Sequence, residues 1–209
     1  MNSIYIIFIA SNYRMGKAIR AATGARYNHV ALSFSPRPEC MYSFSRKHLS
    51  TPFVGGFVCE RVTRYTFGGQ DTDVRMCRVE LDEEMYSRAR NIIADFSARQ
   101  EKLKYNYLSA GAYLAGRRCD VRDCYTCIDF VRYVLGIDKF VTFEELECRF
   151  ASGEVYCGPI SGVAVPPLGD EPDDYFRRPG HFWALLHGTG DRMVMLWRFV
   201  TGPFVKSKK

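Results

Sequence analysis

The sequence lacks a long apolar run. The stretch Ile4–Ala10 falls far short of the roughly 18 consecutive apolar residues that span a bilayer. No positively charged segment precedes it, and no cleavage site of small residues follows it. These absences argue against a transmembrane segment and a secretory signal peptide. We therefore expect a cytoplasmic protein in which this run is a buried first strand.

Internal repeats, low-complexity tracts and a basic stripe interleaved with aromatic residues are also absent. The net charge of +6 comes from 29 basic against 23 acidic residues, and Lys206, Lys208 and Lys209 supply half of it. A nucleic-acid partner is therefore not expected. The charge leans slightly toward anionic substrates or surfaces. Nothing in the sequence implies a cofactor, and the oligomeric state stays open.

What is present is ordinary globular composition, with 209 residues of which 47% are apolar and 25% charged. The chain is long enough to bury a core without covalent staples. Near residue 165 the composition shifts to proline, glycine and charge, so we divide the chain into a domain at 1–164 and a C-terminal extension at 165–209, packed on that domain. In the extension, two apolar pieces around the turn sequence Gly-Thr-Gly-Asp (188–191) are expected to be extra strands.

Hydrophobic periodicity predicts a chain that contains both strands and helices. Thr126 and Gly136 are expected to cap one helix, and Thr142 with Glu145 has the spacing of a capping box for another. The expected strands are residues 3–10, a strand beginning at residue 29 with a hairpin partner near 41–46, an extended stretch after 55, and 73–81. The expected helices are residues 12–23, 82–103, 105–116, 126–136 and 142–153.

The eight cysteines are expected to be free thiols in the absence of a secretory signal. Cys59 and Cys77 lie in apolar, strand-like sequence and are interpreted as small core residues. Cys127 differs because it opens a predicted helix. There the helix dipole and free amide groups stabilise a thiolate, and a nearby imidazole would do so further.

A cysteine nucleophile needs a base, and the chain has only four histidines. His48 lies in a polar stretch, while His181 and His187 flank an apolar piece of the extension. His29 directly precedes a predicted strand, so a sheet edge could present it to the start of the cysteine helix. Taken singly, each residue is more often structural than catalytic, and only their pairing suggests a Cys-His dyad.

The segments that carry these residues, "YNHVALSF", "MYSFSR", "GGFVCE", "YNYLSAGAYL" and "CYTCIDFVRYVL", occur in a characteristic order. Residues 1–160 resemble the circularly permuted NlpC/P60 branch of the papain-like superfamily, which includes the YaeF/YiiX-like and lecithin:retinol acyltransferase-like proteins. In that branch the histidine strand precedes the cysteine helix. His29 and Cys127 match the family histidine and cysteine in this order.

The resemblance implies an α+β domain with a permuted papain-like (NlpC/P60) fold, in which an antiparallel sheet packs against the helix that carries the cysteine. It also implies a cysteine hydrolase (a thiol peptidase or amidase) or an acyltransferase. Cys127 would be the nucleophile and His29 the general base, with a thioester intermediate. The implied substrate is a peptide, an amide or a lipid-like acyl compound.

The third polar group of such a site is not obvious from the sequence. The strand after the histidine strand offers Tyr42, Ser43 and Ser45, and Glu60 in "GGFVCE" is an alternative carboxylate. Tyrosines are further candidates for stabilising an oxyanion, beside the backbone amide of Cys127. These tyrosines are Tyr13, Tyr27 and Tyr107.

Two other interpretations remain open. Cys119, Cys124 and Cys127 have a C-x4-C-x2-C spacing that could belong to a zinc site, although no second pair follows at a typical distance. A zinc ion there would exclude a free nucleophile at Cys127. Alternatively, the domain is a non-catalytic binding module on the same fold, which the missing third group and the extension favour.

Overall fold

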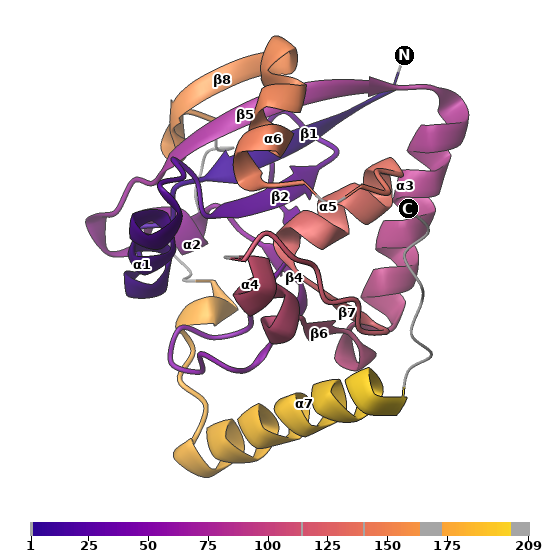
Figure 1. Cartoon of the computed structure of the whole chain (residues 1–209). Helices are drawn as coiled ribbons and strands as arrows, with labels where there is room; N and C mark the ends of the chain where they lie inside the picture. The colour runs from indigo at the N-terminus through magenta and orange to yellow at the C-terminus, as the bar shows by residue number, and fades with distance from the viewer. Residues whose placement is uncertain (1, 114, 140, 164–172, 202–209) are drawn as a thin grey trace.

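An antiparallel sheet of six strands forms the centre of the computed structural model, which describes residues 2–113, 115–139, 141–163 and 173–201 (Figure 1). Helices surround the sheet, so the expected α+β class is confirmed. The strand order is β4-β3-β2-β1-β5-β8. The strands are β1 (Asn2–Ile9), β2 (His29–Ser33), β3 (Met41–Arg46), β4 (Gly55–Glu60), β5 (Asp73–Leu81) and β8 (Glu154–Pro159).

The apolar strand β1 lies in the middle of the sheet, as its composition predicts. Ile6 and Phe8 face one side and Ile7 and Ile9 the other, and none of the four side chains is exposed. Because successive strand residues point to opposite faces, a strand that is apolar on both sides belongs where both faces are covered. At its end, β1 pairs Ile9 with His29 of β2, which fixes the position of the histidine.

The two faces of the sheet are covered unequally. Most of the large apolar side chains pack on the face that carries three helices, whereas the other face holds a smaller cluster around a short helix and a 3-10 turn. The larger layer consists of α3 (Glu83–Ala98), α5 (Cys127–Leu135) and α6 (Phe143–Phe150), and the smaller of α2 (Thr63–Thr66) and the 3-10 turn Ile160–Val163.

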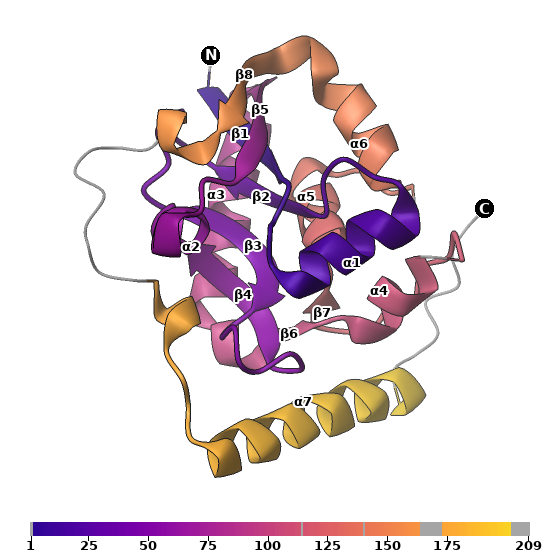
Figure 2. The same cartoon turned by 90° about the vertical axis from the view of Figure 1, so that its left-hand side faces the viewer.

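Two further helices, α1 (Arg14–Thr23) and α4 (Tyr107–Tyr113), flank the start of α5 (Figure 2). Two short strands, β6 (Lys104–Tyr105) and β7 (Cys124–Tyr125), pair in parallel. β6 lies just before α4 in the chain, and β7 lies just before α5. This pair brings the two helix starts together. The arrangement leaves a hollow in front of the first turn of α5.

The C-terminal extension contains one long helix, α7 (His181–Thr201), so the expectation of two strands around a turn is wrong. Figures 1 and 2 both show α7 along one edge of the molecule. Met195 packs beside Val121 and Cys124, and an ion pair of 2.7 Å joins Asp191 to Lys104. Residues 164–172 and 202–209 lie outside the described residues. Within the described part of the chain, no helix is both long and apolar enough to cross a membrane.

The cysteines depart from expectation at one pair. Cys40 and Cys59 form a disulfide, with Cα atoms 5.6 Å apart, so the interpretation of Cys59 as a free core residue is wrong. β3 and β4 form a hairpin in which Cys59 lies opposite Tyr42. Cys40 directly precedes β3 and therefore lies close to Cys59, which explains the pairing. Cys77 is free and fully buried, as expected.

Candidate functional site

Cys127 is the first residue of α5, and the local sequence sets this boundary. The Thr126 side chain accepts a hydrogen bond of 3.1 Å from the backbone N–H of Asp129, and the Asp129 carboxylate accepts one of 3.2 Å from the N–H of Thr126. This capping box starts the helix at Cys127, and Gly136 ends it in the left-handed region with φ of 66°. Both caps were predicted from the sequence.

The rest of α5 holds the thiol in one place. Phe130, Val131 and Val134 have no exposed surface and pack in the main core, and the helix lies against β2 and β3. A helix fixed along its apolar face cannot shift its first turn freely. The Cys127 side chain is therefore presented at a defined point above the sheet.

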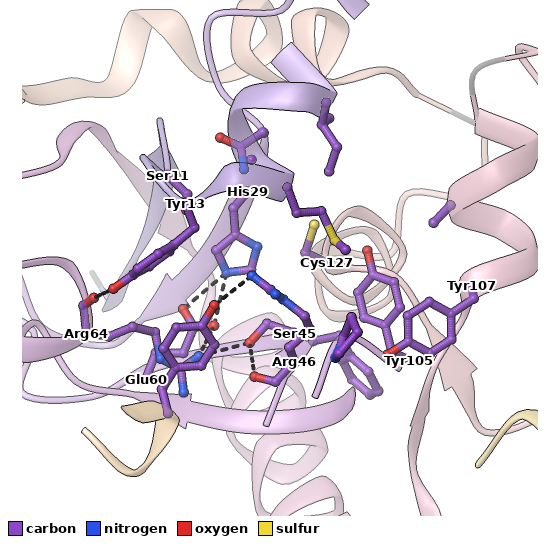
Figure 3. A pocket seen from close by; sticks show the side chains of 18 of the residues that line it. Ser11, Tyr13, His29, Ser45, Arg46, Glu60, Arg64, Tyr105, Tyr107 and Cys127 are labelled. Carbon is purple, nitrogen blue, oxygen red and sulfur yellow. Dashed lines mark hydrogen bonds and ion pairs between the residues drawn. The ribbon is translucent and has the colours of Figure 1, made fainter. Parts of the chain in front are cut away.

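His29 lies between Cys127 and Glu60 (Figure 3). Its imidazole and the Cys127 thiol line the same cavity, and the thiol lies close enough to influence the pKa of His29. The ring nitrogen Nε2 lies 3.1 Å from both carboxylate oxygens of Glu60. The strand order places these groups, because His29 begins β2 while Glu60 ends β4, two strands away. The structure thus aligns thiol, imidazole and carboxylate in one row.

Glu60 is completely buried, and its carboxylate is held from several sides. Ser43 donates a hydrogen bond of 2.7 Å to Oε1, Tyr65 donates one of 2.7 Å to Oε2, and Arg64 contributes an ion pair of 2.9 Å. A buried carboxylate needs such partners, since burial without them is costly. These contacts hold Glu60 in a single orientation toward His29.

Charge and hydrogen bonding shift the pKa values of this pair strongly. Burial by itself would lower the pKa of His29, but the Glu60 carboxylate with its hydrogen bonds and the neighbouring Cys127 outweigh burial and raise this pKa to about 10. Burial by itself would raise the pKa of Glu60, but the charges of His29 and Arg64 outweigh it and lower that pKa well below its usual range. Both shifts favour an imidazolium beside a carboxylate.

The row of three groups opens into a cavity of about 190 Å³. Its wall includes His29, Glu60 and Cys127, together with Arg46 and Phe53. A second cavity, of about 280 Å³, adjoins Cys127 on the side of α1 and is lined mainly by apolar groups. We call it the apolar cavity; its lining residues from α1, α4, α5 and α6 include Ala18, Ile19, Ala22, Ala110, Ile128 and Phe143.

The tyrosine candidates fall into different places. Tyr107 lines the first cavity, and its buried hydroxyl has no hydrogen-bond partner among the described residues. Tyr13 also lines this cavity but donates its hydroxyl to the Arg64 carbonyl at 2.6 Å. Tyr27 is buried near Cys157, and Tyr42 stacks on a phenylalanine of β4, so neither belongs to the site.

Among the serine candidates, Ser45 lines the first cavity and accepts a hydrogen bond of 2.9 Å from Arg64, so it supports the arginine and does not contact His29. Ser43 contacts Glu60, as described above. Of the possible third groups named from the sequence, only Glu60 contacts His29 in the described part of the chain.

Sequence reasoning missed four members of the site. Tyr105 points its hydroxyl toward Cys127 (Figure 3). Arg64 and Tyr65 contact Glu60 directly, and Asp173 contacts Arg64. Tyr105 sits two residues before Tyr107 in the short strand β6, where the pairing with β7 was not foreseen. Arg64, in the stretch after β4, would have indicated a buried carboxylate if its burial had been known. The hydrophobic periodicity of that stretch does not predict the burial of an arginine.

The three cysteines considered for zinc do not come together in one place. Cys119 and Cys124 pack in one small cluster with Val121 and Met195, whereas Cys127 lines the cavity with His29. Across the residues that the structure describes, no three His, Cys, Asp or Glu side chains are grouped to hold a metal ion. The zinc interpretation of Cys119, Cys124 and Cys127 is therefore not supported by the geometry.

No family model, no curated protein and no solved structure matches this chain. The arrangement of Cys127, His29 and Glu60 has to be interpreted on its own chemistry.

Proposed function

We propose that the protein is a cysteine hydrolase or acyltransferase in which Cys127 is the nucleophile, His29 the general base and Glu60 the group that orients His29. One observation carries this proposal, namely the row of thiol, imidazole and buried carboxylate at the wall of a cavity. A nucleophile held by a base that is itself held by a third group is the geometry of a catalytic triad.

The reaction follows from the positions of these groups. The Cys127 sulfur attacks an acyl carbonyl carbon, its proton resides on His29, and the carbonyl π electrons move to the oxygen. His29 then gives the proton to the leaving amine or alkoxide as the carbon–heteroatom bond breaks, which leaves a thioester. Water or an amine, deprotonated by His29, attacks the thioester and releases the sulfur as thiolate, which regains the imidazolium as its partner.

Stabilisation of the oxyanion would come from the start of α5. The first backbone N–H groups of a helix lack acceptors within the helix, and the helix dipole favours negative charge there. Tyr105 and Tyr107 stand on the other side of the cavity, and the unpartnered hydroxyl of Tyr107 can donate to an incoming oxygen. These donors surround the carbon that Cys127 would attack.

The site also supports the resemblance to the permuted NlpC/P60 branch. The histidine strand precedes the cysteine helix in the chain, the sheet is antiparallel, and a glutamate contacts the histidine. This glutamate comes from β4, whereas the third group of that branch comes from the strand directly after the histidine strand, here β3. We therefore propose a permuted papain-like fold for this domain. The missing third group was one of two arguments for a non-catalytic binding module, beside the C-terminal extension, and Glu60 speaks against that first argument.

The apolar cavity beside Cys127 favours a substrate whose acyl part is apolar, among the peptide, amide and lipid-like acyl classes. Its walls are mostly small or apolar side chains, and an aliphatic chain bound there would lose its contact with water. Arg46 lines the first cavity and is absent from the wall of the apolar cavity, so a polar or anionic leaving group in the first cavity would find a cation.

The test uses covalent capture. The wild-type protein is incubated with p-nitrophenyl acetate and, separately, with iodoacetamide at neutral pH, and intact mass with peptide mapping locates the adduct. We expect an acetyl thioester and a carboxamidomethyl group on Cys127, with release of p-nitrophenol that Cys127→Ala abolishes and His29→Ala reduces by about 10²-fold or more. Iodoacetamide should label Cys127 more slowly in His29→Ala than in wild type.

Cys148→Ala is the matched control, since Cys148 is a free, exposed cysteine on α6. It should release p-nitrophenol at the wild-type rate. If Cys127→Ala hydrolyses the ester as fast as wild type while remaining folded, the enzymatic proposal fails. If iodoacetamide labels Cys127 of the wild-type protein no faster than Cys127 of His29→Ala, the result would point instead to the binding module.

A further inference from the structure

Helix α7 carries an apolar face that points away from the domain. Seven side chains recur at steps of three, four or seven residues and therefore lie on one side of the helix. Their exposed fractions run from 46% for Leu196 to 80% for Phe182. We call this set the outer face of α7: Phe182, Leu185, Leu186, Met193, Leu196, Trp197 and Val200.

The opposite side of α7 attaches the helix to the domain. Gly188, Asp191 and Met195 are buried there, and an ion pair joins Asp191 to Lys104. A Cβ atom at Gly188 would lie 3.9 Å from Phe53 and Val54, so the helix runs close to the loop before β4. These contacts fix the orientation of α7, so that the outer face points away from the domain.

The sequence of the C-terminal segment carries charge of one sign after Asp191. Asp191 is the only acidic residue of α7, and its carboxylate is buried against Lys104. From residue 192 to 209 the sequence has five basic residues and no acidic one. Of the two that belong to α7, Arg192 is exposed, whereas Arg198 donates to the Lys102 carbonyl on the domain side. Segments of this charge repel one another and are attracted to a negatively charged surface.

We propose that α7 binds the surface of an anionic lipid bilayer, with its outer face in the boundary between headgroups and acyl chains. At 1.5 Å per residue its 21 residues extend about 31 Å, enough to lie along such a surface as an amphipathic helix. Phe182 and Trp197 are residue types suited to that boundary, and basic residues next to an apolar face select anionic lipid. This proposal does not depend on the reaction proposed above.

The membrane surface would then lie beside the catalytic cavity. Phe53 lines that cavity, while Arg192 of α7 stacks over its ring at 4.5 Å. The loop that carries Phe53 is thus shared between the cavity wall and the inner side of α7. A bilayer on the outer face would be one helix diameter away from this loop.

The experiment is flotation of the full chain with two kinds of vesicle, one of phosphatidylcholine alone and one of phosphatidylcholine with phosphatidylserine. We expect binding to the anionic vesicles, loss of most of that binding at high salt, and a blue shift of tryptophan emission. Trp183 is the only other tryptophan, so the spectra are recorded in a Trp183→Phe background to report Trp197 alone.

The double variant Leu186→Gln with Trp197→Gln tests the outer face, and we expect its partition onto anionic vesicles to fall by more than about tenfold. Val155→Gln is the matched control, because Val155 is 53% exposed on β8, away from α7. Thermal unfolding of each variant shows that it is folded. The control should bind like wild type.

Three results would overturn the proposal. The first is no flotation with either vesicle. The second is equal binding to neutral and anionic vesicles, which would remove the role of the basic residues. The third is a stable dimer in analytical ultracentrifugation that the double variant dissociates and that anionic vesicles do not, which would assign the outer face to a second copy of the chain.

Discussion

At the scale of single residues, Glu60 decides what His29 can do. Its carboxylate lies 3.1 Å from Nε2, and Ser43, Arg64 and Tyr65 prevent it from turning away. Removing the negative charge while keeping the shape should therefore disturb the imidazole more than the fold.

Glu60→Gln is expected to lower the rate of ester hydrolysis by about 10²- to 10⁴-fold, since an amide can neither stabilise the imidazolium nor select its tautomer. The measurement is p-nitrophenol release under single-turnover conditions. Glu147→Gln serves as control, because Glu147 forms an ion pair of 2.5 Å with Arg75 and does not line the cavity. Unchanged hydrolysis in Glu60→Gln would remove Glu60 from the mechanism.

The raised pKa of His29 makes stability depend on pH in a defined direction. Protonated His29 stabilises the folded state fully below its unfolded pKa of 6.5, and this contribution is lost as the pH rises toward about 10. Glu60, whose pKa is lowered, contributes above its ordinary value of 4.5 and loses this contribution only in acid. Between pH 6.5 and 10, His29 is therefore the member of the pair that titrates.

We expect the stability advantage of wild type over His29→Gln to shrink by on the order of a few kcal/mol between pH 6.5 and 10. Urea unfolding at a series of pH values measures it. His48→Gln is the comparison, since the His48 ring contacts the Asp174 carbonyl and no carboxylate. A difference between wild type and His29→Gln that stays constant over this range would contradict the ion pair.

Two residues of the site could be predicted because each stands at the start of an element. Cys127 follows a capping threonine, and His29 precedes a strand. Glu60 remained one of several candidates because the order of strands in the sheet, which brings β4 within reach of β2, is not written in local periodicity. Arg64 and Asp173 were missed because they contact one another across 109 positions of the chain.

At the scale of elements, the start of α5 should matter more for activity than for stability. Capping boxes begin both α5 and α6, with Thr126 and Thr142 in equivalent places. Only the first of them positions a reactive side chain.

Thr126→Ala and Thr142→Ala should each reduce the free energy of unfolding by about 1 kcal/mol, the usual cost of losing a cap. Thr126→Ala should in addition slow acylation, because the first turn that holds Cys127 frays. Thr142→Ala should acylate at the wild-type rate. Equal acylation rates in the two variants would mean that the core contacts of α5 alone position the thiol.

The apolar cavity gives a second prediction at this scale. Ala22→Trp on α1 places a large ring in that cavity, so hydrolysis of p-nitrophenyl esters should fall for long acyl chains and persist for acetate. Ala21→Trp is the matched control on the same helix, because Ala21 lines neither cavity next to Cys127. The ratio of kcat/KM for octanoate to that for acetate measures the effect, and an unaltered ratio in Ala22→Trp would exclude this cavity as the acyl site.

Most of the longer elements could be predicted from the sequence, whereas β6, β7, β8, α2 and α7 could not, and α7 shows one reason. Its sequence Gly-Thr-Gly-Asp suggested a turn between two apolar strands. In the structure Gly188 is buried inside the helix beside Phe53 and Val54, so tertiary packing outweighs the low helix propensity of glycine. The spacing of Phe182, Leu185 and Leu186 already indicated a helical face, although an exposed one.

At the scale of the whole molecule, the segment after residue 172 is joined to the row of Cys127, His29 and Glu60 through Asp173. This buried carboxylate accepts hydrogen bonds from the backbone of Arg61 at 2.9 Å and of Tyr175 at 2.8 Å, and it pairs with Arg64 at 3.0 Å. Arg64 in turn pairs with Glu60. Composition suggested a division of the chain near residue 165, but it could not show that residues beyond it complete the environment of the site.

Asp173→Ala should therefore reduce the free energy of unfolding by about 1–3 kcal/mol, because the buried N–H of Tyr175 and the part-buried N–H of Arg61 lose their acceptor. Among the described residues, Arg64 would then keep Glu60 as its charged partner. Asp174→Ala, at the exposed neighbouring position, should have little effect on urea unfolding. Because Asp173 and Glu60 share Arg64, their effects cannot be independent. A double-mutant cycle with Glu60→Gln should give a coupling energy above about 0.5 kcal/mol, and strict additivity would mean that residues 173–201 merely rest on the domain without supporting its site.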